Sequence, residues 1–223
     1  MRRTNDGARV GGGWLAIASS LMIAGLALHG PIDPDLSAQM SKIADHPTVW
    51  TVSHWITAAG LSLLTVAGLI VLTSGSRLTD GWWTTTAWAV LPVTCLWIMT
   101  TAVAEATVVT NAAVAGNTEM FEAWWAFAEG KATGVAFLAL AVAVIAANDA
   151  QSAQEVTPAW SAWTGMAAGV ASFSGWALGM WFDIRFGSVL WVASTIIMSA
   201  WLVWFGVALA RSSASVVPAA DAR

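Results

Sequence analysis

Residues 82–148 read WWTTTAWAVLPVTCLWIMTTAVAEATVVTNAAVAGNTEMFEAWWAFAEGKATGVAFLALAVAVIAAN and form the most informative stretch of the sequence. Two long apolar runs within it meet at Gly116 and Asn117, and this pair is typical of a tight turn. The pattern therefore predicts two helices that fold back on each other as a hairpin. Glu105 lies twelve residues before Asn117 and Glu129 lies twelve residues after it. A helical hairpin would place these two carboxylates at one depth.

The composition indicates a membrane protein. The chain is 57% hydrophobic and only 10% charged, and its mean hydropathy is +0.68, whereas soluble domains are about 25% charged. Apolar runs recur at about 20 residues, the length that crosses a hydrocarbon layer about 30 Å thick. We therefore predict an all-α, polytopic membrane helix bundle with six transmembrane helices in a single domain, residues 14–210. The predicted spans are 14–30, 48–73, 82–115, 121–148, 158–181 and 187–210.

The distribution of Lys and Arg predicts the orientation. Short loops rich in these residues stay in the cytoplasm. With the N-terminus inside, the cytoplasmic side carries Arg2, Arg3, Arg9, Arg77, Arg211 and Arg223, and the outer side carries Lys42, Lys131 and Arg185. This predicts a cytoplasmic N-terminal segment at 1–13 and a disordered cytoplasmic tail at 211–223. The expected location is a prokaryotic cell membrane.

The start of the chain also has the basic residues and short apolar core of a secretory signal. No small-residue cleavage site precedes Pro31, so we expect an uncleaved first span. The sixteen Trp lie mostly near the ends of the apolar runs, as in an interfacial aromatic belt. The net charge of −4 and the lack of a basic patch argue against a nucleic-acid partner. The expected partners are the lipid bilayer and, in addition, a membrane protein or a second copy of this chain.

Ionisable residues from several spans are predicted to share one layer near the extracytoplasmic face. Counting about 20 residues from the cytoplasmic end of each span locates that boundary. The layer contains His29, His54, Glu105, Glu129 and Asp183, with Arg185 and Lys131 as candidate charge partners. On a helical projection, His54 and Glu105 each share a sector with threonines, and such weakly polar stripes normally face the protein interior.

Two functional readings of this layer stay open. Imidazoles and carboxylates are ligands for Zn, Mn, Fe or Cu, and two histidines could ligate a haem. Carboxylates inside a membrane can also carry protons or mark a solute pathway. No short-spaced metal motif is present. The most distinctive string is HPTVWTVSHW at 46–55, where His46 and His54 are eight residues apart.

Two further interpretations compete with a binding site. A histidine base would need a nucleophile, and the nearest, Ser53, is a poor partner for His54 because adjacent helical residues point about 100° apart; an enzymatic role is therefore disfavoured. The polar layer could also be interfacial side chains that face headgroups and water, in a structural or accessory subunit. Such a subunit could dock through the small-residue motifs Gly165-x3-Gly169 and Gly175-x3-Gly179, although we expect these to pack within the bundle.

Overall fold

The computed structural model describes residues 2–152 and 156–212, except for the side chains of residues 2–5 and of Lys131. Within these residues the chain is helical and has no strand. The helices are α1 (Arg2–His29), α2 (Leu36–Asp45), α3 (Pro47–Thr73), α4 (Trp82–Ala104), α5 (Thr110–Val114), α6 (Thr118–Ala132), α7 (Gly134–Gln151), α8 (Ala159–Trp176) and α9 (Arg185–Arg211). A 3-10 turn forms at Arg77–Thr79, and π-helical segments form at Glu105–Val109 and Ala177–Trp181.

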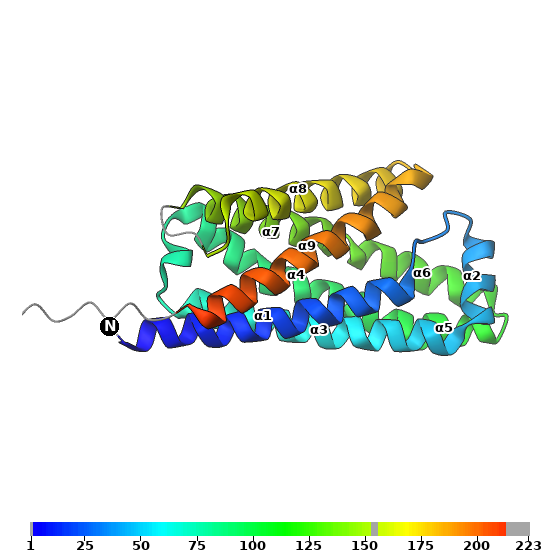
Figure 1. The fold of residues 1–223 in the computed structure, drawn as a ribbon. Coiled ribbons are helices and arrows are strands. Elements are labelled where there is room, and N and C mark those ends of the chain that lie inside the picture. The colour runs from blue at the N-terminus through cyan, green and yellow to red at the C-terminus, as the bar shows by residue number, and fades with distance from the viewer. Residues whose placement is uncertain (1, 153–155, 213–223) are drawn as a thin grey trace, which may run out of the picture.

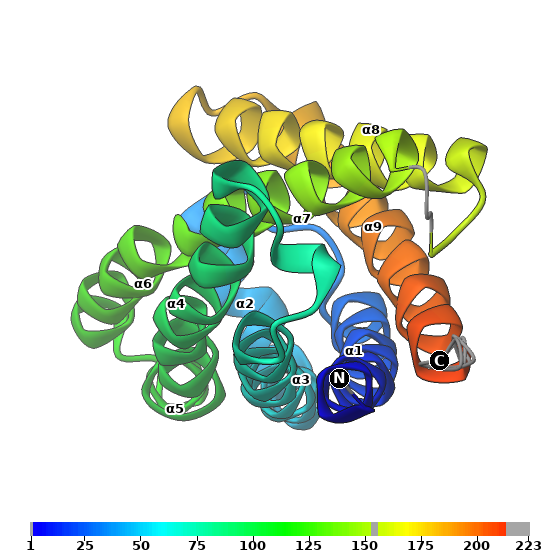
Figure 2. The same ribbon diagram turned by 90° about the vertical axis from the view of Figure 1, so that its left-hand side faces the viewer.

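Six long helices form a closed ring. Each packs on the next in chain order: α1 on α3, α3 on α4, α4 on α7, α7 on α8, α8 on α9, and α9 back on α1. Figure 2 shows this ring end-on, from the end of the bundle at which the N-terminus lies. The short helices α2 and α5 lie at the end of the bundle opposite the N-terminus (Figure 1). The centre of the ring is therefore enclosed by all six long helices.

Five helical stretches are long and apolar enough to cross a membrane: Asp6–His29, Pro47–Thr73, Trp82–Val114, Thr118–Gln151 and Arg185–Arg211. Large apolar side chains such as Trp82, Val93 and Ile197 are exposed on the outside of the bundle. Both features are consistent with an integral membrane protein. The predicted span 158–181 is also helical, as α8 and the π segment that follows it, but it is not among the five. Its many Trp, Ser, Gly and Thr residues make it less apolar.

The observed boundaries differ from the predicted ones at several places. Helix α1 begins at Arg2 instead of residue 14, because Gly11 and Gly12 let its first turns approach α3 and α9 closely. The predicted span 82–115 changes to π-helix at Glu105, and the predicted span 121–148 is divided at Thr133 between α6 and α7. Of the predicted disordered tail, residues 213–223 lie outside the described residues.

The predicted hairpin is confirmed. Gly116 adopts φ +65°, a left-handed conformation that glycine adopts without steric cost. The N–H groups of Gly116 and Asn117 donate to the carbonyls of Ala113 and Ala112, which ends α5. The Asn117 side-chain oxygen then accepts from Met120 N–H and caps α6. The turn therefore brings α6 back along the helix that carries Glu105.

The glycine motifs of the predicted fifth span pack within the bundle, as expected. A Cβ added at any of the four glycines would collide with a neighbouring helix of the same chain. The facing residues are Trp201 for Gly165, Ala139 and Ala143 for Gly169, Trp191 and Gly187 for Gly175, and Gly187 and Ser188 for Gly179. These motifs therefore hold α8 against α7 and α9. The close helix contacts that such glycines permit are made within this chain.

Asp35 caps the N-terminus of helix α2, and this cap should make the helix sensitive to acid. The Ser37 hydroxyl and the N–H groups of Ala38 and Ser37 donate to the Asp35 carboxylate and hold its pKa below the usual 3.8. The stabilisation is therefore complete above the unfolded pKa and is lost as the pH falls through the folded one. Amide hydrogen exchange should show α2 losing protection below about pH 3.8. Asp35→Asn keeps an N-cap without the charge, so an equal acid loss in this variant would contradict the assignment.

Candidate functional site

Three of the predicted site residues come together at the end of the ring nearest α2. His29 is the last residue of α1, His54 lies two turns into α3, and Glu105 opens the π segment after α4. Because α1 and α4 end where α3 begins, the three side chains reach one level. His54 and Glu105 are only 5% and 6% exposed, and His29 is partly buried. We call these residues the inner cluster.

The inner cluster is compact enough to share one ion. Each residue offers one ligand atom, and these three atoms all lie within 4.8 Å of one another. His54 Nε2 and Glu105 Oε2 lie 2.9 Å apart. The rings of His29 and His54 have centroids 5.0 Å apart. Two imidazoles and a carboxylate from three helices therefore converge inside the bundle.

Backbone carbonyls orient both imidazoles. His54 Nδ1 lies 2.8 Å from the Trp50 carbonyl, and His29 Nδ1 contacts the Gly30 carbonyl. Since a carbonyl oxygen can only accept, each Nδ1 carries its proton and donates it. When either ring is neutral, its lone pair is therefore on Nε2. In His54 this is the atom that faces Glu105.

The π segment places Glu105 against α3. The Thr110 hydroxyl donates to the Glu105 carbonyl at 2.6 Å, and the Thr51 hydroxyl donates to the Ala106 carbonyl at 3.4 Å. The second bond ties the widened turn to α3. π-Helical turns are rare, and they occur frequently at functional sites. The Glu105 N–H still donates to the Thr101 carbonyl of α4, so the widened turn follows Glu105, and its carboxylate faces His54 of α3.

Aromatic rings enclose the inner cluster. Trp50 packs on both imidazoles, with ring centroids 4.5 Å from His29 and 4.7 Å from His54. Trp191 meets His29 edge-on at 6.2 Å, and Trp176 meets Trp191 at 5.0 Å. Burial beneath these rings strengthens electrostatic interactions inside the site.

A cavity of about 70 Å³ adjoins the inner cluster at the centre of the ring. Apart from the cluster itself, its walls are mostly apolar, and they come from all six long helices of the ring. Its polar neighbours include Thr57 and Thr101, whose hydroxyls donate to the carbonyls of Ser53 and Ala128. The inner cluster therefore lies at one side of a small enclosed space.

The other predicted residues lie outside the inner cluster. Glu129, Asp183 and Arg185 are exposed and line a second pocket, of about 250 Å³, together with Asp33. Ile32 lines both this pocket and the central cavity. Lys131 is part of α6, and its side chain is not described. The predicted layer thus divides into an inner cluster and an outer acidic rim.

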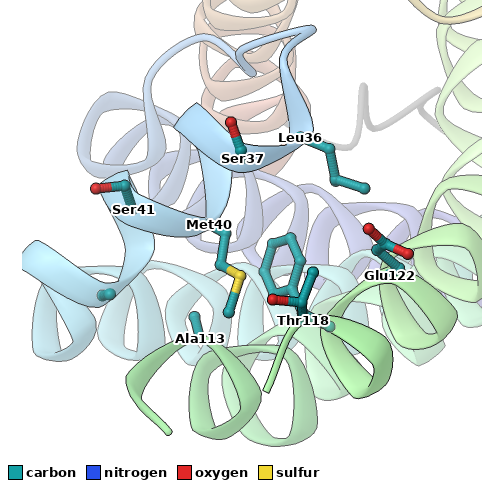
Figure 3. Close-up of a pocket in the computed structure, with 9 residues that line it drawn as sticks. Leu36, Ser37, Met40, Ser41, Ala113, Thr118 and Glu122 are labelled. Atoms are coloured by element: carbon teal, nitrogen blue, oxygen red, sulfur yellow. The ribbon is translucent and has the colours of Figure 1, made fainter. Parts of the chain in front are cut away.

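A third hollow lies between α2 and the α5–α6 turn, with a volume of about 290 Å³. Figure 3 shows Leu36 and Met40 of α2 on one side of it and Ala113, Thr118 and Glu122 on the other. Its lining contains no histidine and only one carboxylate. It has no part in the inner cluster.

Ser53 contacts His54 despite the helical angle between them. Its Oγ lies 3.2 Å from His54 Nδ1, so the expectation that the two side chains point apart is wrong. The reason is that both bend back to the same acceptor: the Ser53 hydroxyl donates to the Trp50 carbonyl at 2.8 Å. Because that proton is directed to the carbonyl, Ser53 is not arranged as a nucleophile with His54 as its base.

Sequence reasoning missed the roles of Trp50, Trp176 and Trp191. Trp50 precedes His54 by one helical turn within the HPTVWTVSHW string, and this spacing was a usable signal. Nothing in the sequence distinguishes Trp176 and Trp191 from the other tryptophans. The sequence pattern predicts that these are interfacial anchors. Both are instead buried beside the inner cluster, at 2% and 6% exposure.

Comparisons with protein-family models, with curated proteins and with solved structures found no match to this chain.

Proposed function

We propose that this chain is a membrane protein that binds one divalent transition-metal ion, with Zn²⁺ as the reference ion, at His29, His54 and Glu105. The observation that carries the proposal is the convergence of three ligand atoms within 4.8 Å inside the bundle. A Zn²⁺ ion with bonds of about 2.0–2.1 Å holds tetrahedral ligands about 3.3 Å apart. Small side-chain movements suffice to close the cluster around the ion.

The surroundings of the imidazoles support this proposal. In metal sites, a ligating histidine usually donates its second N–H to a carbonyl or carboxylate, which fixes the tautomer and orients the ring. Both His29 and His54 donate in this way to backbone carbonyls. Their Nε2 atoms are then the available ligands, and Glu105 adds an oxygen that carries the negative charge.

The size of the cavity favours an ion over a haem. Pockets that hold cofactor-sized ligands measure about 300–1,000 Å³, and the cavity beside the inner cluster measures about 70 Å³. Packing of Trp50 on both rings also fills the space that a porphyrin would need.

Proton handling is the second candidate, and the 2.9 Å contact between His54 and Glu105 favours it. One proton shared by the pair gives an imidazolium and a carboxylate, which together are neutral. A metal also accounts for His29, whose ligand atom lies within 4.8 Å of the other two, whereas a shared proton needs only His54 and Glu105.

We further propose six spans, with both termini in the cytoplasm and the inner cluster near the extracytoplasmic face. The bias of Lys and Arg supports this orientation. The position of α8 within the ring supports a sixth span, since α8 packs along both α7 and α9. The exposed apolar residues would face the lipid bilayer. The alternative, an accessory subunit that docks through α8, has less support because the glycines of α8 already contact α7 and α9.

Elemental analysis of the protein purified in mild detergent and equilibrated with Zn²⁺ tests the proposal. We expect about one tightly bound zinc per chain, as in a mononuclear site. His54→Ala should lose this zinc, because it removes a central ligand. His46→Ala is the matched control, since His46 is exposed at the N-terminus of α3 and outside the cluster. Equal zinc binding by the His54 and His46 variants would refute the site. So would the absence of bound zinc in the parent protein and in both variants.

A further inference from the structure

Three tryptophans beside the inner cluster, Trp50, Trp176 and Trp191, have buried N–H groups with no acceptor among the described residues, and the last two of them line the central cavity. The indole nitrogens of Trp176 and Trp191 make no hydrogen bond with any residue that the structure describes. Both side chains line the central cavity together with His29, His54 and Glu105. Buried donors are nearly always paired, because an unpaired one loses its bonds to water without replacement. Because both rings line the cavity, a ligand atom held there would supply the missing acceptors.

The charge of a loaded site indicates the sign of that ligand. A divalent ion held by two neutral imidazoles and one carboxylate leaves a net charge of +1. Isolated charge in an apolar interior is strongly unfavourable, and the cavity walls are mostly apolar. One bound monoanion brings the sum to zero. Three protein ligands also leave one position open on a tetrahedral ion, as in catalytic zinc sites.

We propose that the cavity binds a small monoanion, which coordinates the metal at its open position and accepts hydrogen bonds from the indole N–H groups of Trp176 and Trp191. Hydroxide takes this place when no other anion is present. The inference rests on the proposed metal site and extends it by naming the class of ligand. A volume of about 70 Å³ is small beside the roughly 300–1,000 Å³ of pockets that hold drug-sized ligands, so the ligand is limited to a few heavy atoms with oxygen or nitrogen donors.

Cobalt and azide provide a direct test on the full-length protein in detergent. Co²⁺ prefers the same ligands as Zn²⁺ but absorbs visible light, so a change in its coordination changes the spectrum. Azide should shift the spectrum of the Co²⁺-loaded protein in a saturable way. Trp176→Phe and Trp191→Phe keep an aromatic ring and remove the N–H, so each should weaken azide binding about tenfold, as expected for one hydrogen bond to a charged group. Co²⁺ affinity should stay within about twofold, because neither residue is a ligand.

Trp201→Phe is the matched control. Its indole N–H is likewise buried without a partner, but Trp201 packs in the bundle core and does not line the cavity. This variant should bind azide like the parent protein. Retained Co²⁺ binding in all three variants shows that the fold is intact.

The outcomes separate the two proposals. Absence of Co²⁺ binding in the parent protein refutes the metal site, and the anion site with it. Bound Co²⁺ with a spectrum that azide leaves unchanged refutes the anion site alone. Azide binding that weakens equally in all three tryptophan variants, or in none of them, refutes the role of Trp176 and Trp191.

Discussion

Replacing Gly12 with alanine will lower the free energy of unfolding by about 1–3 kcal/mol, the usual result of overpacking, whereas the same change at Gly13 will raise it slightly. A Cβ at Gly12 would lie 2.7 Å from the Gly206 carbonyl oxygen and 2.9 Å from Ala210 N, both backbone atoms of α9. Backbone atoms cannot rotate away, so α1 and α9 must separate. A Cβ at Gly13 meets nothing within 4 Å.

The two adjacent glycines control for each other. Alanine gains about 0.5–1 kcal/mol over glycine inside a helix, and this gain applies at both positions. The difference between the two variants therefore reports the contact of α1 with α9. Reversible unfolding in detergent micelles, followed by circular dichroism, measures both. Gly206→Ala should behave like Gly12→Ala, because its Cβ would lie 2.6 Å from the Gly12 carbonyl oxygen. Equal stability of the Gly12 and Gly13 variants would show that the ring does not close between α1 and α9.

This contact illustrates where sequence reasoning on the fold stopped. Apolar runs and turn residues were sufficient to predict an all-helical bundle and the hairpin at Gly116. Residues 1–13 were predicted to be a cytoplasmic segment outside the first span, because they carry Arg2, Arg3 and Arg9. Only the packed ring shows what Gly11 and Gly12 contribute. At Gly12, α9 approaches α1 so closely that a side chain would block the contact. Propensity is local, whereas this stabilisation comes from a helix nearly 200 residues away in the chain.

The candidate site was predictable in part for a related reason. Counting residues along straight helices brought His29, His54 and Glu105 to one level, and the structure places them together. The same counting included Glu129, which instead lies exposed on α6. A one-residue break at Thr133 separates α6 from α7, and Glu129 of α6 lines the outer pocket instead of the central cavity. Hydropathy does not reveal such a break, nor the π turn at Glu105, since both depend on how backbone bonds are satisfied after packing.

Zn²⁺ at about a thousand times its dissociation constant should stabilise the folded protein by about 4 kcal/mol. The effect follows from mass action, because the unfolded chain separates His29 from Glu105 and cannot offer the three ligands together. Glu105→Gln should abolish most of this stabilisation. It keeps the shape of the side chain but removes the charge and a strong oxygen ligand. The measurement is the unfolding free energy in detergent with buffered free Zn²⁺, compared with the same titration after chelation.

Glu122→Gln provides the control for this prediction, since Glu122 is exposed on α6 and outside the inner cluster. Its response to Zn²⁺ should equal that of the parent protein. A proton-handling pair predicts the opposite pattern: Zn²⁺ would leave the stability of the parent protein unchanged, whereas Glu105→Gln would still alter it in metal-free buffer, because His54 would lose its charge partner. Metal binding and proton handling, the two explanations of the 2.9 Å contact between His54 and Glu105, therefore make different predictions. In the first, the stability of the folded protein depends on Zn²⁺, and in the second it depends only on the Glu105 carboxylate.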